Sequence, residues 1–328
     1  MKLFKKYLSN NRIHTIYECL GIKLKLKNNN LKSIGLTDIF KTNKYVYKKI
    51  DIILPVYNGF EYLKNLLLQI KEFTDLEYDL YVIEDNSTDS RILPLLKEFE
   101  KTYDGKMHLI QNEENLGFLK TVNKGLKLTK NDVCILNTDI QLPKNWATRL
   151  MYYVFTNDKV ATVTPFSNAA TIFSFPKIWE NNDLVLDYNI IDKCFSELSL
   201  DAIPLLEFPT GVGFCMAMSR KAIDKIGLFD EIFEKGYGEE VDWCMRALTM
   251  GFKNCLCPNL FVYHKHGGSF EKTEKEELCL NHNVIINKRY PNYNRLVMDS
   301  SCNSDYMLIR HILLTKLYEY KKIKNKIC

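Results

Sequence analysis

The chain has 328 residues, 46% of them hydrophobic, which suffices for one large α/β domain with extensions or for two domains. Its formal net charge of +5 comes mainly from lysines near the two ends, so composition does not favour a nucleic-acid-binding protein. The sequence has no run of about 18 apolar residues, no apolar signal-peptide core and no dense cysteine framework, so we expect a cytoplasmic protein without a membrane span.

Within the first 150 residues, the composition and the hydrophobic pattern change near Asp51. Residues 1–48 are rich in Lys and Asn and predict a helical or irregular extension. Beyond them, four short apolar runs predict buried strands, and a segment with helical spacing follows each run. The strands are expected at 51–56, 79–84, 106–111 and 133–137. Such alternation predicts right-handed βαβ units, hence a mostly parallel sheet with helices on both faces.

The second half of the chain does not continue this alternation of strands and helices. Strands are expected at 160–165, 212–218, 253–258 and 260–264, and residues 167–208 predict irregular chain with local helix. A helix with Val241 and Leu248 on one face should end at Gly251, and the pattern beyond 275 is helical. The expected organisation is an extension at 1–48, a domain at 49–275 and a C-terminal helical extension at 276–328.

Polar residues follow each strand of the first half, at the edge where open α/β sheets bind ligands. They are the segment Pro55–Gly59, the pair Glu84 and Asp85, the segment 112–117, and Asn137–Asp139. Neither GxGxxG nor GxxxxGK[ST] occurs at these positions, so a bound nucleotide needs another means of neutralising its phosphates. A divalent cation held by Asp139 is the expected means.

These segments carry a resemblance to a known family. ILPVYNG, VIEDNSTD, NLGFLKTVNKG and LNTDIQLPKNW resemble, in order and spacing, the nucleotide-binding half of GT-A, family-2 glycosyltransferases. TGVGFCMAMSRKAIDKIGLFDE, GYGEEVDWCMRA and VYHKHGGSF resemble the acceptor half. The resemblance implies a GT-A domain with a Rossmann-like sheet, divided into a nucleotide-binding half at 49–145 and an acceptor half at 146–275.

The resemblance also implies a donor site. Asp85 would recognise the nucleobase, and the remaining donor contacts would come from Pro55, Val56, Tyr57, Asn58, Asn123, Asn137, Thr138 and Asp139. The family's Asp-x-Asp metal motif appears as Asn137-Thr138-Asp139, so Mn²⁺ or Mg²⁺ would rest on Asp139. A second metal ligand is implied at His264, with His266 as the alternative. A competing interpretation groups both histidines with Cys255 and Cys257 as a zinc site, although C-x-C is tighter than typical zinc pairs.

GYGEEVDW carries the implied catalytic group. The family's general base corresponds to Glu240, and Glu239 and Asp242 are the alternatives. Acidic residues in a first helical turn are also favoured by the helix dipole alone. Tyr237 and Trp243 either shape the acceptor pocket or pack in the core.

The implied activity is inverting transfer of a hexosyl or deoxyhexosyl group from a nucleoside-diphosphate sugar. The acceptor would be a hydroxyl of a glycan, lipid-linked or protein molecule, in cell-surface polysaccharide or glycoconjugate synthesis. The departures at Asn137 and Glu240 leave an alternative open: an inactive GT-A module that binds carbohydrate or a partner protein. A nucleotidyltransferase is a second rival, but VYNGFEY lacks the Gly-rich basic loop that it needs. The basic helix at 307–328 could contact the inner face of a membrane, the domain itself or a second subunit.

Overall fold

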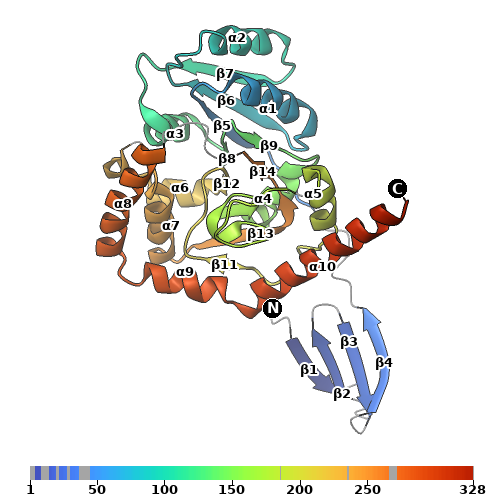
Figure 1. Ribbon diagram of the computed structural model, residues 1–328. Helices are drawn as coiled ribbons and strands as arrows, with labels where there is room; N and C mark the ends of the chain where they lie inside the picture. Colours follow the sequence, from blue (N-terminus) through green and yellow to red (C-terminus); the bar gives the residue numbers. More distant parts are fainter. Residues whose placement is uncertain are drawn as a thin grey trace.

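The computed structural model describes residues 45–184, 186–234, 236–265 and 272–327, and also the backbone of the four segments 4–8, 15–19, 22–27 and 30–36. Side chains are described from residue 45 to 322, apart from the gaps and residues 272–277. Within this part of the chain the centre of the molecule is an eight-stranded sheet of order β11-β13-β10-β12-β8-β5-β6-β7 (Figure 1).

The first half of this sheet is parallel, as the alternation predicted. Its strands are β5 (Ile50–Val56), β6 (Tyr78–Glu84), β7 (Lys106–Gln111) and β8 (Asp132–Leu136). The helices between them are α1 (Phe60–Phe73), α2 (Ile92–Thr102) and α3 (Gly117–Leu128). Helices α1 and α2 pack on one face and α3 on the other, because successive strand residues such as Ile52 and Ile53 point to opposite faces. Val56 pairs with Glu84, and Glu84 with Gln111, so the carboxyl ends of these strands are aligned.

The second half of the sheet contains reversed strands. β12 (Cys215–Met218) runs antiparallel to both β8 and β10 (Val160–Phe166), while β13 (Lys253–Phe261) is parallel to β10 and antiparallel to β11 (Glu207–Phe208). The expected strands at 253–258 and 260–264 are largely one strand. The accompanying helices are α4 (Trp146–Thr156), α5 (Tyr188–Ser196), α6 (Arg220–Ile226) and α7 (Glu239–Thr249), with short 3-10 turns η1 (Thr171–Phe173) and η2 (Glu231–Phe233).

A two-stranded ribbon stands apart from the large sheet. β9 (Ile140–Gln141) pairs antiparallel with β14 (Tyr263–His264), so that His264 lies opposite Ile140. The ribbon joins the end of the parallel half to the end of the last long strand.

The prediction of a helical or irregular N-terminal extension is wrong in its secondary structure. The segment forms a separate antiparallel sheet of β1 (Phe4–Leu8), β2 (Thr15–Cys19), β3 (Ile22–Lys27) and β4 (Asn30–Leu36). Strict alternation of apolar residues and lysines in Ile22–Lys27 is the period of a strand, and it outweighs the Lys- and Asn-rich composition.

The C-terminal extension is helical, as predicted, and consists of α8 (Lys272–Arg289), α9 (Tyr293–Ser301) and α10 (Ser304–Ile327). α10 packs on the domain: the buried Arg310 donates to the carbonyls of Ser174 and Pro176 at 2.8 and 2.7 Å. Of the described helices, none is long and apolar enough to cross a membrane.

Candidate active site

The loops after β5 and β6 are bound to each other at the carboxyl edge of the sheet. The Asn58 amide donates to Ser87 Oγ at 2.9 Å, and Asn58 Oδ1 accepts from the Asp89 amide at 2.9 Å. Asn58 and Gly59 both have positive φ values, 57° and 72°, so the turn is tight. The segment Pro55–Asn58 therefore forms a fixed wall at the strand ends.

Asp85 lies at this edge, where the sequence placed it, but its carboxylate already has partners. Oδ1 accepts from Asn112 Nδ2 at 2.7 Å and from the Leu116 amide at 2.9 Å, and Oδ2 accepts from the Gly117 amide at 2.9 Å. These amides begin α3, where a negative charge is favourable. Asp85 thus fixes the loop between β7 and α3.

Asn123, the expected donor contact in α3, forms hydrogen bonds to the backbone of Phe229. It is buried, its Nδ2 donates to the Phe229 carbonyl at 2.9 Å and its Oδ1 accepts from the Phe229 amide at 3.0 Å. Both ends of the carboxamide are bound in this way, so Asn123 connects α3 to the chain before η2.

The segment Asn137–Asp139 leaves β8 at the same edge. The Asn137 amide donates to the Phe214 carbonyl at 2.8 Å. Its side-chain Oδ1 is buried and accepts no hydrogen bond from the described residues. Thr138 lies beside the β5 turn, since its Oγ1 is 3.9 Å from the place where a Cβ on Gly59 would stand.

The β9–β14 ribbon brings Asp139 and His264 together. His264 Nε2 lies 3.4 Å from Asp139 Oδ1, and the two side chains are only 11% and 15% exposed. The amide of Lys265 donates to the Asp139 carbonyl at 2.9 Å, which extends the ribbon by one bond. The two expected metal ligands are therefore neighbours.

The His264 ring is held in one orientation. Nδ1 is 2.8 Å from the Ala169 carbonyl, which can only accept, so Nδ1 carries the proton and Nε2 faces Asp139. Phe214 stacks on the ring with centroids 5.1 Å apart. The Asn168 side chain donates to the His264 carbonyl and accepts from its amide at 2.9 and 2.8 Å.

This donor set fits a small divalent cation. Two neighbouring ligands of an octahedral Mg²⁺ at 2.0–2.1 Å stand about 3 Å apart, close to the observed separation of 3.4 Å. An imidazole that donates its other N–H to a carbonyl is the usual form of a metal-binding histidine. The unsatisfied Asn137 Oδ1 is a further oxygen at the same strand end.

The alternative zinc site does not form among the described residues. Cys257 Sγ lies 3.4 Å from the Arg149 carbonyl, Cys255 is buried, and no three His, Cys, Asp or Glu side chains of that part of the chain are arranged to hold a metal. His266, the alternative ligand, lies outside the described residues.

Glu239 and Glu240 begin α7 after a turn with unusual backbone. Gly236, Tyr237 and Gly238 have φ values of 126°, 67° and 117°. Glu240 Oε1 accepts from the Gly213 amide at 3.1 Å, and a Cβ on Gly213 would stand 2.7 Å from that oxygen. Any side chain at position 213 would therefore displace the Glu240 carboxylate from where it lies.

The two carboxyl groups lie in different environments. Glu239 is 1% exposed and its Oε2 has no hydrogen-bond partner among the described residues. Burial, and then the charge of Glu240, raises the pKa of Glu239 well above its usual range. Burial also raises the pKa of Glu240, but backbone amides, including that of Gly213, oppose the shift. Burial therefore favours the neutral form more strongly at Glu239 than at Glu240, whose charge the backbone amides stabilise.

Asp242, the other catalytic candidate, is a structural residue. It is fully buried and binds Arg246 Nε at 2.8 Å, Arg289 Nη1 at 2.7 Å and the Tyr290 hydroxyl at 2.8 Å. Its position one turn into α7 directs it towards α8, and the carboxylate has no free side for a substrate. Trp243 is also in the core, where its indole donates to the Gly227 carbonyl.

Asp242→Asn is expected to lower the free energy of unfolding by about 2–3 kcal/mol, because charge-assisted bonds to two arginines are lost. Denaturation in urea measures this value. Asp224→Asn is the matched control: its pair with Arg220 is 3.6 Å long and its side chain is 64% exposed, so the loss should stay below about 1 kcal/mol. Full stability of Asp242→Asn combined with lost turnover would place Asp242 in the chemistry instead.

A line of contacts connects Glu240 to the neighbourhood of Asp139. Glu240 binds the amide of Gly213, the next residue Phe214 accepts from Asn137, and the Phe214 ring stacks on His264. Tyr237 lies between them: its pKa is raised by burial and by the charges of Cys279, Glu240, Glu239 and Asp139. Glu240 and the pair of Asp139 and His264 thus lie near a common region at the carboxyl edge of the sheet.

This arrangement was compared with known proteins. A family model described as "Glycosyl transferase family 2" matches residues 51–227. The chain belongs to this family. Two solved structures are similar to it in fold.

Among solved structures, a Pyrobaculum calidifontis mannosyltransferase in complex with GDP-Man and Mn²⁺ has a TM-score of 0.56 at 16% identity, covering 84% of this chain and 76% of that one. GalNAc-T7 with UDP, GalNAc and Mn²⁺ has a TM-score of 0.53 at 16% identity, covering 71% and 45%. Together they show that this family-2 chain has the GT-A fold.

Two curated relatives of this family-2 chain are polysaccharide synthases of Pasteurella multocida. Chondroitin synthase of strain Pm70 is 23% identical over 76% of the chain and 27% of its own length. Hyaluronan synthase is 23% identical over 69% of the chain and 26% of its own length. The chain thus spans about a quarter of the length of these relatives.

Two residues of the family-2 site were missed from the sequence. Asn168 holds His264 and Phe214 links it to Glu240. Asn168 follows β10, whose carboxyl end points the same way as those of β5 and β8, so the polar pair Ser167-Asn168 was the available signal. Phe214 carried no signal, because an aromatic residue before a buried strand suggests core packing.

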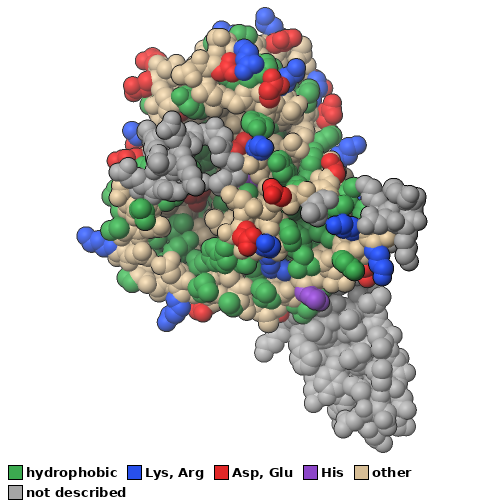
Figure 2. Space-filling view, in the orientation of Figure 1, with side chains coloured by type: hydrophobic (Ala, Val, Ile, Leu, Met, Phe, Trp, Pro, Cys, Tyr) green, Lys and Arg blue, Asp and Glu red, His purple; other side chains and the backbone are tan. Residues whose placement is uncertain are grey.

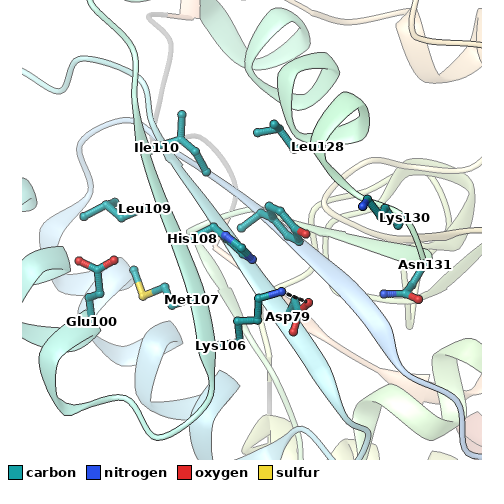
Figure 3. A pocket seen from close by; sticks show the side chains of 11 residues that line it. Asp79, Glu100, Lys106, Met107, His108, Leu109, Ile110, Leu128, Lys130 and Asn131 are labelled. Carbon is teal, nitrogen blue, oxygen red and sulfur yellow. Dashed lines mark hydrogen bonds and ion pairs between the residues drawn. The ribbon is translucent and has the colours of Figure 1, made fainter.

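A groove elsewhere in the family-2 domain is separate from this site (Figure 3). It has a volume of about 630 Å³ and is lined by Asp79, Tyr81, Lys106, His108 and Lys130, among others. Asp79 and Lys106 stand at the amino ends of β6 and β7, the opposite end of the strands from Asp139. Its floor is a stack of Tyr81 on His108 with centroids 4.4 Å apart.

Proposed function

We propose that this chain transfers a sugar from a nucleoside-diphosphate donor to a hydroxyl group of an acceptor, with inversion at the anomeric carbon. The observation that carries the proposal is the line of contacts from Glu240 through Gly213 and Phe214 to Asn137 and His264. It links a charged carboxylate to a cation-binding pair across one edge of the sheet.

In the proposed reaction Glu240 takes the proton of the acceptor hydroxyl as its oxygen attacks the anomeric carbon. The carbon–oxygen bond to the diphosphate breaks on the opposite side, so a single displacement inverts the configuration. A base placed in this way contributes about 10²–10⁴-fold to the rate.

The donor side consists of Asp139 and His264, with the wall Pro55–Asn58 and Thr138 beside them. Mn²⁺ or Mg²⁺, bound by Asp139 and His264, would supply positive charge for the leaving diphosphate. Asp85 contributes by fixing the loop between β7 and α3 at the nucleobase side. The two similar solved structures are complexes with Mn²⁺ and a nucleotide or nucleotide sugar, which supports this choice of donor class.

The acceptor is proposed to be a growing polysaccharide or related glycoconjugate, which the names of the two Pasteurella synthases support. The surface offers a second proposal, contact with a membrane or with a second copy. Hydrophobic side chains gather in the lower half of Figure 2, around α9 and α10, where Met298, Met307, Leu314 and Tyr318 are exposed.

A panel of nucleotide sugars with Mn²⁺ tests the function. Nucleoside diphosphate release that depends on an added oligosaccharide acceptor is expected for one donor, and the anomeric configuration of the product is read by NMR. Binding of donor and glycan without any release would contradict the proposal and favour a carbohydrate-binding module. Retained configuration would contradict the single displacement.

A further inference from the structure

The turn that presents Glu240 is held in place from outside the segment matched by the family model. That segment ends at residue 227, whereas the turn Gly236–Gly238 and the helix α8 both lie beyond it. The backbone of the turn is unfavourable by itself, because Tyr237 has a left-handed φ of 67°. Such a conformation persists only where the surroundings enforce it.

His282 of α8 supplies this constraint. It is 5% exposed, and its Nδ1 lies 2.9 Å from the Gly236 carbonyl and 2.7 Å from the Tyr237 carbonyl. Both carbonyls can only accept, so Nδ1 carries a proton and donates to the two oxygens at once. These carbonyls precede α7 by a few residues, and no α7 amide reaches them.

Packing locks the same contact from both sides. The His282 ring meets the Phe233 ring edge to face at 5.4 Å. A Cβ on Gly238 would stand 3.0 Å from two Phe233 ring atoms and 3.4 Å from His282 Cβ, so the turn fills the space between η2 and α8. The turn therefore has no room to relax without moving His282.

The helix that carries His282 is itself anchored. Arg289, two turns further along α8, binds Asp230 at 2.8 Å and Asp242 at 2.7 Å, and Tyr290 donates to Asp242. Asp242 belongs to α7, as Glu240 does. Thus α8 is tied to both ends of the segment that contains the turn.

We propose that His282 is a positioning residue for catalysis: its bifurcated hydrogen bond fixes the turn Gly236–Gly238 and so sets the direction of the Glu240 carboxylate. This inference rests on the proposed function, in which Glu240 is the base. His282 itself touches no reacting atom.

Three variants of the full chain test the proposal. His282→Phe keeps a ring against Phe233 but loses the donor, His282→Asn replaces the Nδ1–H with an amide N–H, and His311→Leu is the control on the exposed face of α10. We expect His282→Phe to lower kcat about 10²-fold, as a misplaced catalytic group does, with KM for the donor nearly unchanged. His282→Asn should recover most of kcat, and His311→Leu should match the native chain.

Amide hydrogen exchange of residues 236–240 gives a second readout that needs no turnover. We expect faster exchange there in His282→Phe and native protection in His282→Asn and His311→Leu. Native kcat and exchange in His282→Phe would overturn the proposal, as would equal impairment of the Phe and Asn variants. If His282→Phe does not fold, fast exchange at 236–240 in His282→Asn overturns it and native exchange upholds it.

The two proposals fail in distinguishable ways. If the native chain releases no nucleoside diphosphate from any donor, the proposed function fails, while the exchange of residues 236–240 still decides whether His282 fixes the turn. If the native chain is active and the turn exchanges equally fast in all variants, only the role of His282 fails.

Discussion

Glu240→Gln is expected to reduce sugar transfer by about 10²–10⁴-fold, because the amide cannot accept the proton of the acceptor hydroxyl. The glutamine has nearly the same shape and can still accept from the Gly213 amide, so the fold and the donor site should be preserved. Turnover is measured as nucleoside diphosphate release, and donor affinity by calorimetry with Mn²⁺. Parallel loss of both quantities would mean that Glu240 is structural.

Glu239→Gln is the matched control at the neighbouring carboxyl group. Burial raises the pKa of Glu239 well above its usual range and so favours its neutral form, which the neutral amide resembles; transfer should therefore be largely retained. A severe loss in Glu239→Gln with a mild effect of Glu240→Gln would exchange the roles of the two residues.

The stability of Glu239→Gln should also depend on pH. The pKa of Glu239 is raised in the folded state, so the folded chain binds its proton more tightly than the unfolded chain does. The native chain is therefore expected to lose stability as pH rises above about 4.3, the unfolded value for Glu, and the glutamine variant should not show this loss. Melting temperatures at pH 5 and pH 8 measure the difference, and equal slopes for both proteins would contradict it.

Asp139→Asn is expected to abolish Mn²⁺ binding in the presence of nucleoside diphosphate. Asp139 is the negative member of its pair with His264, and the first motif position is the neutral Asn137, so the amide removes the negative ligand from this pair. Electron paramagnetic resonance of free Mn²⁺ measures the affinity without requiring turnover. Cys257→Ala, within the core near Arg149, is the control and should bind Mn²⁺ normally.

Asn168→Ala tests a residue that holds the backbone of His264 in place. Loss of the two bonds to the His264 backbone should weaken Mn²⁺ binding about 10–100-fold, the usual effect of removing a residue that orients a metal ligand. Unchanged affinity in this variant would show that Ala169 and Phe214 suffice to orient the ring.

The sequence predicted those parts of the fold whose residues repeat over several turns or strands. Four βα alternations, the irregular segment after β10 and the C-terminal helices are all present. The N-terminal strands were missed because composition was given more weight than the alternation in Ile22–Lys27. The ribbon of β9 and β14 has two residues per strand, too few for any period to be visible.

The candidate site, too, could be predicted from the sequence only in part. Residues at strand ends, such as Asp139, could be placed from the strand pattern, because parallel strands end at one edge. The role of Asp242 could not, since its partner Arg289 is 47 residues further along the chain. The contact that Asn123 makes could not be predicted for the same physical reason: its partner Phe229 lies 106 residues away, and no pattern local to α3 indicates the contact.

The two strands of the β9–β14 ribbon are synthesised at different times. Asp139 is synthesised with the nucleotide-binding half, but its partner His264 belongs to the last quarter of the chain. While the ribosome is still adding the residues between them, Asp139 is present and His264 is not. The pair that we propose to bind the cation is therefore completed late in translation, after the turn Gly236–Gly238 has already emerged.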